Sequence, residues 1–296
     1  MNYDHQYHAG NAADCVKHLA LSLTLQILTR KDSPLAYIET HAGAGRYTLG
    51  TQGEHLQGVS RLWVDRRSLP HVGAWLKIVS NENTDGALRH YPGSPALAAA
   101  LLRSTDRMVL CEEQPEVATR LRKAMGKRAH TSVIGEDGYR ALFGQIPPPE
   151  KRGLVLIDPP FERRDEWERL ADILIRAYQR WPQGVYLVWY PVKIRGTITR
   201  LWQALRERLP AFACELLQMP EEGREQLFGS GLIVVNPPWG LREALAAALT
   251  ELGPLLSAPQ GGGLWSLRCQ GWPGPEKSQP AYTTGHHPNP PALFRR

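Results

Sequence analysis

The chain has 296 residues, of which 42% are hydrophobic and 22% charged, an ordinary composition for a soluble globular protein. This length suffices for one large α/β domain with an insertion or for two modest domains, and no apolar run approaches the roughly 20 residues that span a bilayer. The formal net charge of +6 favours a polyanionic partner without establishing one.

The cysteines lie far apart in the sequence and form no CxxC pair: they are Cys15, Cys111, Cys214 and Cys269. No histidine stands near them at metal-ligand spacing, so we predict no metal site. We expect buried or incidental free thiols rather than a disulfide framework. The first residues do not form a basic segment followed by an apolar stretch, so the sequence predicts no signal peptide and a cytoplasmic protein.

In chain order, the first predicted elements are an amphipathic helix and a short apolar strand at 35–38, which ends in a glycine turn at 39–45. Residues 46–104 interrupt this alternation with Gly-rich and turn-forming sequence and two further helices. We interpret them as a small, mostly helical insertion. The predicted helices of this half cover residues 12–30, 68–80 and 95–103.

Strands and helices then alternate as far as residue 252. Strands are predicted at 108–111, 131–134, 153–157, 185–189, 212–218 and 231–235, and helices at 115–126, 138–144, 165–180, 195–208 and 241–252. This alternation implies an α/β fold with a mainly parallel sheet covered by helices on both faces. Residues 271–296 are rich in Pro, Gly, His and Ser and cannot bury a core, so we predict a disordered tail.

The glycine turn after the first strand is a candidate cofactor site, because ligands of open α/β sheets bind at the carboxyl ends of the strands. Gly43 and Gly45 would let a cofactor approach the backbone closely. A dinucleotide-binding turn would have a third glycine where this chain has Thr48. The difference disfavours a nicotinamide cofactor and suits S-adenosylmethionine, a sulfonium cation without phosphate.

Two acidic residues follow the next two strands. Glu112 is placed to accept hydrogen bonds from ribose hydroxyls, and Asp137, followed by Gly138, is placed to accept one from an adenine amine. Each could also be an exposed loop acid, but two acids at successive strand ends favour a cofactor site. The neighbouring Glu113 is an alternative to Glu112 that the sequence does not exclude.

The most specific motif is Asp158-Pro159-Pro160-Phe161, which follows an apolar strand. An aromatic amine is a poor nucleophile because its lone pair is delocalised into the ring. If Asp158 accepts one amine hydrogen and a carbonyl of the Pro-Pro segment accepts the other, the lone pair points at the methyl group to be transferred. Asp158 would take the proton, and Phe161 would offer a flat face to an unstacked base. The structural alternative is a strand-ending Asp with a proline turn.

A second loop, Asn236-Pro237-Pro238-Trp239, has the Asn-Pro-Pro-aromatic form of the same motif. It follows the last predicted strand, too late in the order of sites, so we interpret it as a structural turn before the final helix. Near the N-terminus, Lys17 and His18 lie on the first helix, where simple exposure would explain them. His41, inside the glycine turn, is a better candidate for a cofactor contact.

Taken together, these motifs resemble the bacterial 23S ribosomal RNA (adenine(2030)-N6)-methyltransferase family. The resemblance extends in order from Tyr3 to about Trp239. Its motifs are His8-Ala9-Gly10-Asn11 with Asp14 and Lys17-His18, Thr40 to Tyr47, Tyr91 to Pro95, Asp137-Gly138, Leu156 to Pro160, Trp189-Tyr190-Pro191 and Asn236 to Trp239. Phe161 departs from the family, in which Tyr is also familiar, and the tail has no counterpart.

The resemblance implies a Rossmann-like class I methyltransferase fold with a small helical insertion after the first strand. The methyltransferase domain would comprise residues 1–45 and 105–257, with the insertion at 46–104 and the tail at 271–296. The implied reaction is methyl transfer from S-adenosylmethionine to the N6 amine of a specific adenine in 23S rRNA. The substrate would be free rRNA or an early assembly intermediate, and the enzyme a monomer without an obligate protein partner.

The resemblance also assigns roles to individual residues. Asp158 would be the catalytic acceptor and base. Substrate contacts are expected from Tyr3, Pro159, Pro160 and Phe161. Cofactor contacts are expected from Lys17, His18, His41, Ser94, Glu112, Asp137, Gly138 and Asp158, together with Gly43 and Gly45 of the turn.

Other functions remain open at this point. An adenine-N6 methyltransferase could act on DNA or on another RNA, but no DNA target-recognition domain is recognisable. The Asp-Pro-Pro loop disfavours a glutamine methyltransferase, and the intact Asp158 and glycine turn disfavour a catalytically silent RNA-binding protein. A nicotinamide oxidoreductase is the weakest alternative. The basic stretches 120–123 and 195–208 are candidate RNA contacts.

Overall fold

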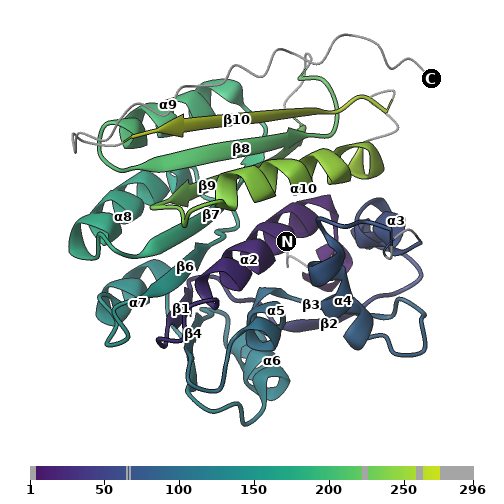
Figure 1. Ribbon diagram of the computed structural model, residues 1–296, viewed down its shortest axis with the longest axis horizontal. Coiled ribbons are helices and arrows are strands. Elements are labelled where there is room, and N and C mark those ends of the chain that lie inside the picture. Colours follow the sequence, from purple (N-terminus) through teal and green to yellow (C-terminus); the bar gives the residue numbers. More distant parts are fainter. Residues whose placement is uncertain (1–4, 65, 67, 222–225, 258–262, 274–296) are drawn as a thin grey trace.

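A twisted sheet of eight strands runs through the molecule (Figure 1). The structure, a computed structural model, describes residues 5–64, 66, 68–221, 226–257 and 263–273. The strand order is β10 (Ser266–Trp272), β8 (Ala211–Leu217), β9 (Gly229–Val235), β7 (Val185–Val192), β6 (Gly153–Ile157), β1 (Ala36–Glu39), β4 (Arg107–Cys111) and β5 (Thr131–Ile134).

Five of these strands form the parallel sheet that the alternating pattern predicts. β1 pairs in parallel with β4 and β6, β4 pairs with β5, and β6 pairs with β7. The chain builds outward from β1 through β4 to β5 and then crosses back over β1 to form β6. The order therefore reverses beside β1, where a ligand site is expected in folds of this kind.

Three further strands extend the sheet on the β7 side, each antiparallel to its neighbour. β9 pairs with β7 and β8, and β10 pairs with β8 at the edge. β10 is not among the strands predicted from the sequence. Its side chains alternate between exposed and half-buried as far as the buried Trp272, and most of them are not apolar. Gly271 and Trp272 of the predicted tail belong to β10, and residues 274–296 lie outside the described residues.

Helices cover both faces of the sheet, as predicted, and bury a core on each (Figure 1). One face carries α2 (Ala12–Leu28), α5 (Ser94–Leu101), α6 (Pro115–Met125) and α10 (Leu241–Leu256). The other carries α7 (Gly138–Gln145), α8 (Glu166–Arg180) and α9 (Arg195–Arg206). β6 is buried at every position because helices cover both of its faces, which explains its uninterrupted apolar sequence.

The segment interpreted as an insertion contains helices, but it also contains a small sheet that the sequence analysis did not predict. β2 (Arg46–Thr48) and β3 (His90–Pro92) form an antiparallel pair. Between them lie η1 (Glu54–Gln57), α3 (Val59–Trp63) and α4 (Gly73–Asn81), and the short α1 (His5–His8) precedes α2. α4 and η1 contact α2, so this segment packs over the N-terminal helix.

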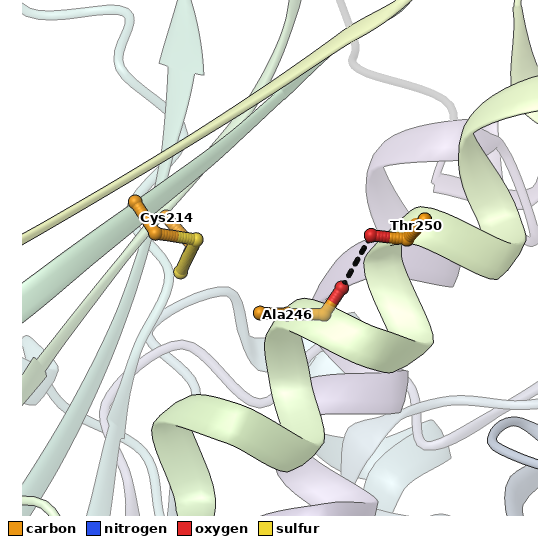
Figure 2. The surroundings of a disulfide bond; sticks show 4 residues. Cys214, Ala246 and Thr250 are labelled. Atoms are coloured by element: carbon orange, nitrogen blue, oxygen red, sulfur yellow. Dashed lines mark hydrogen bonds between the residues drawn. A yellow bond between two sulfur atoms is a disulfide. The ribbon is translucent and has the colours of Figure 1, made fainter. Parts of the chain in front are cut away.

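The expectation of four free thiols is wrong for one pair, because Cys214 of β8 and Cys269 of β10 form a disulfide (Figure 2). They are 55 residues apart in the sequence but lie directly opposite each other in the antiparallel register, with 4.2 Å between their Cα atoms. Without a predicted β10 the pairing could not be recognised. The disulfide lies on the sheet face that α10 covers, whereas Cys15 and Cys111 are free and buried.

The Asn236-Pro237-Pro238-Trp239 loop lies far from Asp158 because of strand direction. β9 is antiparallel to β7, so the loop leaves the sheet at the edge where β6 and β7 begin. The Asn236 amide donates to the carbonyls of Pro182 and Gly184, at 3.2 and 3.4 Å. Trp239 is 90% exposed, and α10 follows directly. The loop is a structural turn, in agreement with its position in the sequence.

No helix in the described ranges is long and apolar enough to cross a membrane.

We predict that Gly231→Ala destabilises the sheet by about 1–3 kcal/mol or more, because a Cβ atom there would lie 2.1 Å from the ring of Tyr190. That ring cannot easily move: its hydroxyl donates to the buried Glu215 at 3.0 Å, and Arg195 pairs with the same carboxylate at 2.7 Å. The free energy of unfolding in urea measures the effect. Gly144→Ala, a helix position with open space, should instead stabilise by about 0.5–1 kcal/mol. Equal stability of the two variants would contradict this packing argument.

Candidate active site

A cavity of about 980 Å³ opens at the carboxyl ends of the parallel strands. The loops after β1, β4, β5 and β6 and the end of β7 all contribute to its wall. Most of the residues singled out from the sequence line it: Lys17, His18, His41, Gly43, Ser94, Glu112, Asp137, Gly138, Asp158, Pro159, Pro160 and Phe161. Gly45 does not line the cavity, and Tyr3 lies outside the described residues.

The glycine turn after β1 is held by the acid at the end of β4. Gly43 has φ of 62°, a left-handed conformation that favours glycine. Its N–H donates to Glu112 Oε2 at 3.0 Å, and Glu112 Oε1 accepts from the Gln114 N–H at 2.9 Å. Glu112 is buried and Glu113 is exposed, so Glu112 is the acid that shapes the turn. A carboxylate offers about four acceptor sites, which leaves Glu112 capacity for a ligand.

Gly45 has a different position in the same turn. It also has a left-handed backbone, with φ of 78°, and its carbonyl accepts from the Gly93 N–H at 2.9 Å. A Cβ atom there would lie 3.0 Å from Leu121 and 3.2 Å from Met125, both on α6. Gly45 therefore joins β2 and β3 to the turn and packs against α6 rather than facing the cavity.

Asp137 and Gly138 bring the loop after β5 against the glycine turn. A Cβ atom on Gly138 would lie 1.8 Å from the Thr40 carbonyl oxygen, so only glycine fits. Asp137 caps α7, where its Oδ1 accepts from the Tyr139 N–H at 2.8 Å, and its Oδ2 pairs with Arg169 at 3.1 Å. These contacts hold the carboxylate at the cavity wall.

His41 and His18 line the cavity as neutral imidazoles. Burial lowers the pKa of His41 to about 4 and that of His18 to about 3. His41 Nδ1 lies 2.8 Å from the Thr40 hydroxyl, and its ring meets Tyr139 edge-on with 5.1 Å between centroids. His18 Nδ1 lies 2.7 Å from the Tyr91 hydroxyl. Both rings are thus fixed hydrogen-bonding groups without charge at neutral pH.

Lys17 joins the first helix to the Asp-Pro-Pro loop. Its Nζ lies 2.5 Å from Asp158 Oδ2 and 2.9 Å from Asp14 Oδ1. Burial alone would lower the pKa of Lys17, but the two carboxylates hold it well above its usual value. Burial alone would likewise raise the pKa of Asp14, but the charge of Lys17, with hydrogen bonds from Lys17 and the Gly10 N–H, keeps it at about 2. Asp14 is an ion-pair partner that the sequence motif contained without a role.

Glu39 is a second buried acid beside the site to which the sequence analysis gave no role. It is the last residue of β1, and it accepts from the Ser94 hydroxyl at Oε1 and from the Tyr37 hydroxyl at Oε2, the latter at 2.7 Å. Burial raises the pKa of Glu39 to about 8 despite these donors. The signal available in the sequence was its position, at the start of the predicted glycine turn.

Aromatic side chains surround the end of the Asp-Pro-Pro loop. Phe161 has a left-handed backbone, with φ of 53°, which is uncommon for a bulky residue and is typical of functional sites. Its ring centroid lies 4.7 Å from that of Trp167 and 6.0 Å from that of Trp189. Trp189 and Pro191 of β7 line the same cavity. Next to Asp158 the cavity thus offers rings suited to a flat ligand.

The sequence and the fold are both similar to those of known proteins. The profile of the family described as "Ribosomal RNA large subunit methyltransferase D, RlmJ" matches residues 32–268. The chain is 38% identical to ribosomal RNA large subunit methyltransferase J of Escherichia coli, over 85% of this chain and 92% of that protein. It is 36% identical to the protein of the same name from Haemophilus influenzae, over 93% and 100%. The crystal structure of protein LPL1258 from Legionella pneumophila superposes with a TM-score of 0.84 at 35% identity, covering 90% of this chain and 98% of that one.

The protonated Glu39 should make stability fall as pH rises. An ordinary glutamate has a pKa of 4.5 and folded Glu39 one of about 8, so the folded state binds a proton that the unfolded state has lost between these values. The stabilisation is complete below about pH 4.5 and is lost as pH rises through 8, a change on the order of a few kcal/mol.

We predict that Glu39→Gln removes this loss, so the difference in unfolding free energy between wild type and variant changes steadily from pH 5 to 8.5. Urea unfolding at a series of pH values measures it. His18 and His41 titrate in both proteins, so their contributions to the free energy of unfolding cancel in the difference between wild type and variant. Glu113→Gln, at an exposed position, is the control and should follow the wild type. Parallel curves for wild type and Glu39→Gln would contradict the burial argument.

Proposed function

The chain belongs to the family described as ribosomal RNA large subunit methyltransferase D, RlmJ, and we propose that it transfers a methyl group from S-adenosylmethionine to the N6 amine of an adenine in 23S rRNA. The observation that carries the proposal is the position of Asp158. This residue follows β6 at the cavity, with two prolines and an aromatic residue directly after it. Its surroundings match what methylation of an exocyclic amine requires.

The residues of the cavity fit S-adenosylmethionine. Gly43 and Gly138 line the cavity at two strand ends, and neither has room for a Cβ atom, which would meet the Tyr47 hydroxyl or the Thr40 carbonyl. Glu112 and Asp137 offer carboxylate acceptors for hydroxyl and amine groups, and His41 adds an uncharged hydrogen-bonding group. The volume of about 980 Å³ lies at the upper end of ligand cavities, enough for a cofactor together with a target base. When bound, the cofactor supplies the electrophilic methyl group.

In the proposed mechanism Asp158 acts on the amine of the target base. Its carboxylate accepts a hydrogen bond from the amine, and it takes the proton that the amine loses. Lys17 engages Oδ2 and favours the ionised form that can accept this proton. Pro159 and Pro160 restrict the loop, so that a carbonyl can accept from the second amine hydrogen. The ring of Phe161 stacks on the target base.

Contact with RNA is proposed for the cationic side chains at the rim of the cavity. Arg120 and Lys193 both line it, and neither has an ion pair or hydrogen bond among the described residues. Arg195, in the second basic stretch, is instead occupied by Glu215 and Glu221, both at 2.7 Å. In that region we therefore propose that Lys193, just before α9, contacts the RNA, and not Arg195 at the start of the helix.

The proposal also comprises a monomer in the cytoplasm that acts on free 23S rRNA or an early assembly intermediate without an obligate protein partner. Adenine-N6 methylation of DNA or of another RNA, and RNA binding without catalysis, are the competing functions. Methylation assays on protein-free 23S rRNA, assembly intermediates and DNA distinguish the substrates. Light scattering of the purified protein measures the oligomeric state.

We predict that Asp158→Asn lowers the rate of methyl transfer by at least 10²-fold while the protein stays folded, because the proton acceptor is lost. The assay follows labelled methyl from S-adenosylmethionine into 23S rRNA that lacks native methylation, with nucleoside analysis of the product. Combining Asp158→Asn with Asn236→Asp moves the Asp-Pro-Pro sequence to the second loop and should restore nothing, because that loop lies at the opposite edge of the sheet. An unchanged rate in Asp158→Asn would remove this residue from the mechanism.

Removal of rim charges should weaken RNA binding and its dependence on salt. For Arg120→Gln and Lys193→Gln, we expect the slope of log K against log salt to fall by about 0.7–0.9 per charge that contacts phosphate. Fluorescence anisotropy with a 23S rRNA fragment at several salt concentrations measures it. Lys151→Gln, an exposed charge just before β6 at the opposite edge, is the matched control and should leave the slope unchanged. If all three variants behave alike, RNA does not bind at this rim.

A further inference from the structure

We propose that Leu227 contacts the nucleotide next to the target adenine, and that it packs against the base face that is uncovered when the adenine leaves the stack. This role rests on the proposed function. It assigns the apolar part of the RNA contact to a residue outside both the glycine turn and the Asp-Pro-Pro loop.

The antiparallel part of the sheet forms a wall that extends past the Asp-Pro-Pro loop. β6 and β7 form their last pair at Ile157 and Val188, directly before Asp158. β7 continues to Val192 with β9 as its remaining partner. Every second residue of this extension lines the cavity, and the series runs from the interior to an exposed position: Trp189, Pro191 and, beyond the strand, Lys193.

Leu227 lies at the outer end of this wall. The backbone of the next residue, Phe228, donates to the Val192 carbonyl and accepts from the Gln218 N–H, both at 2.8 Å. The Phe228 side chain is buried in the core beneath α8 and α9. These contacts fix the chain beside Leu227, whose side chain lines the cavity and is 40% exposed. Among the large apolar side chains that the described residues expose, Leu227 is the one that lines the cavity.

The position of Leu227 matches a step that the reaction requires. A single exposed leucine is ordinary elsewhere on a surface, but this one lies where the substrate must enter. An adenine stacked between its neighbours cannot reach Asp158, so the base has to be unstacked first. Unstacking uncovers the flat face of the adjacent base, and proteins that separate bases cover such faces with Leu, Ile, Phe or Met.

The charge beside Leu227 favours a nucleic acid as the occupant of this surface. Lys193 follows Val192, to which Phe228 is bound, so Lys193 and Leu227 come from adjacent segments. An ammonium group next to an apolar side chain suits a nucleotide, which presents a phosphate and a base. A protein seated on Leu227 would instead close the cavity to the RNA.

The test is a cycle that combines a protein variant with a base deletion in the RNA. Two 23S rRNA fragments that carry the methylated adenine are compared: one keeps the native sequence, and the other has abasic nucleotides on both sides of the adenine. For wild type and Leu227→Ala, kcat/KM for methyl transfer and the dissociation constant of each fragment are measured. Leu264→Ala, at a leucine that is 58% exposed and does not line the cavity, is the matched control.

With the native fragment we expect Leu227→Ala to lower kcat/KM about five- to tenfold, the loss of one leucine's apolar contact. With the abasic fragment the base that Leu227 contacts is missing, so the variant should stay within about twofold of wild type. Leu227→Met keeps an apolar side chain of similar volume and should retain most of the activity. Leu264→Ala should stay within about twofold of wild type on both fragments.

A loss by the same factor on both fragments would overturn the role of Leu227, because the residue would then not act through the neighbouring base. Where the abasic fragment is methylated too slowly to follow, the dissociation constants complete the cycle. If urea unfolding shows that Leu227→Ala does not fold, Leu227→Gln, which keeps the volume and loses the apolar surface, takes its place.

The wild-type protein separates this role from the proposed function. If the wild type methylates the native fragment and Leu227→Ala equals it, the role of Leu227 is refuted and the proposed function stands. If the wild type methylates neither fragment nor full-length 23S rRNA, the proposed function is refuted.

Discussion

Five parallel strands that end at one edge of a sheet are the constraint on which the site depends. Because β1, β4, β5, β6 and β7 run in the same direction, the loops that follow them meet at one cavity. Strand direction is therefore enough to bring Gly43 and Asp158, which are distant in the sequence, to the same cavity. The closest approach is between Gly138 and the Thr40 carbonyl, where there is no room for a Cβ atom. β9 runs in the opposite direction, so the Asn236-Pro237-Pro238-Trp239 loop that follows it lies at the opposite edge of the sheet, away from the cavity.

The sheet brings the strand ends together, but the N-terminal helix supplies the charge. Lys17 of α2 reaches Asp158 across the face that α2 covers. Asn11 caps the same helix, and its side-chain amide donates to Glu54 of the segment between β1 and β4. A continuous series of polar contacts therefore links that segment to the Asp-Pro-Pro loop through Asp14. Any displacement of α2 along the sheet would change the distance between Lys17 and Asp158.

Features encoded by a few consecutive residues could be predicted from the sequence, whereas features that depend on contacts between distant segments could not. The parallel sheet and the Asp-Pro-Pro loop come from short runs of apolar, Gly and Pro residues, and both were found. The Cys214–Cys269 disulfide was missed because β10 has alternating polar side chains and lies at an edge of the sheet. Glu39 was not singled out because its burial, like the contact of Lys17 with Asp158, exists only once α2 and α5 cover the sheet. The roles of the individual site residues stay predictions until they are tested.

Buried charge is the part of this structure that folding alone does not explain. Taking an ion out of water costs several kcal/mol, and well-packed apolar residues often replace a buried ion pair without loss of stability. Here three charges and the acid Glu39 lie together at the cavity that five strands build. A purely structural role would favour balanced pairs, as Asp137 has with Arg169. Lys17 instead lies between two carboxylates, Asp14 and Asp158, and Asp158 is the one that the proposed reaction uses.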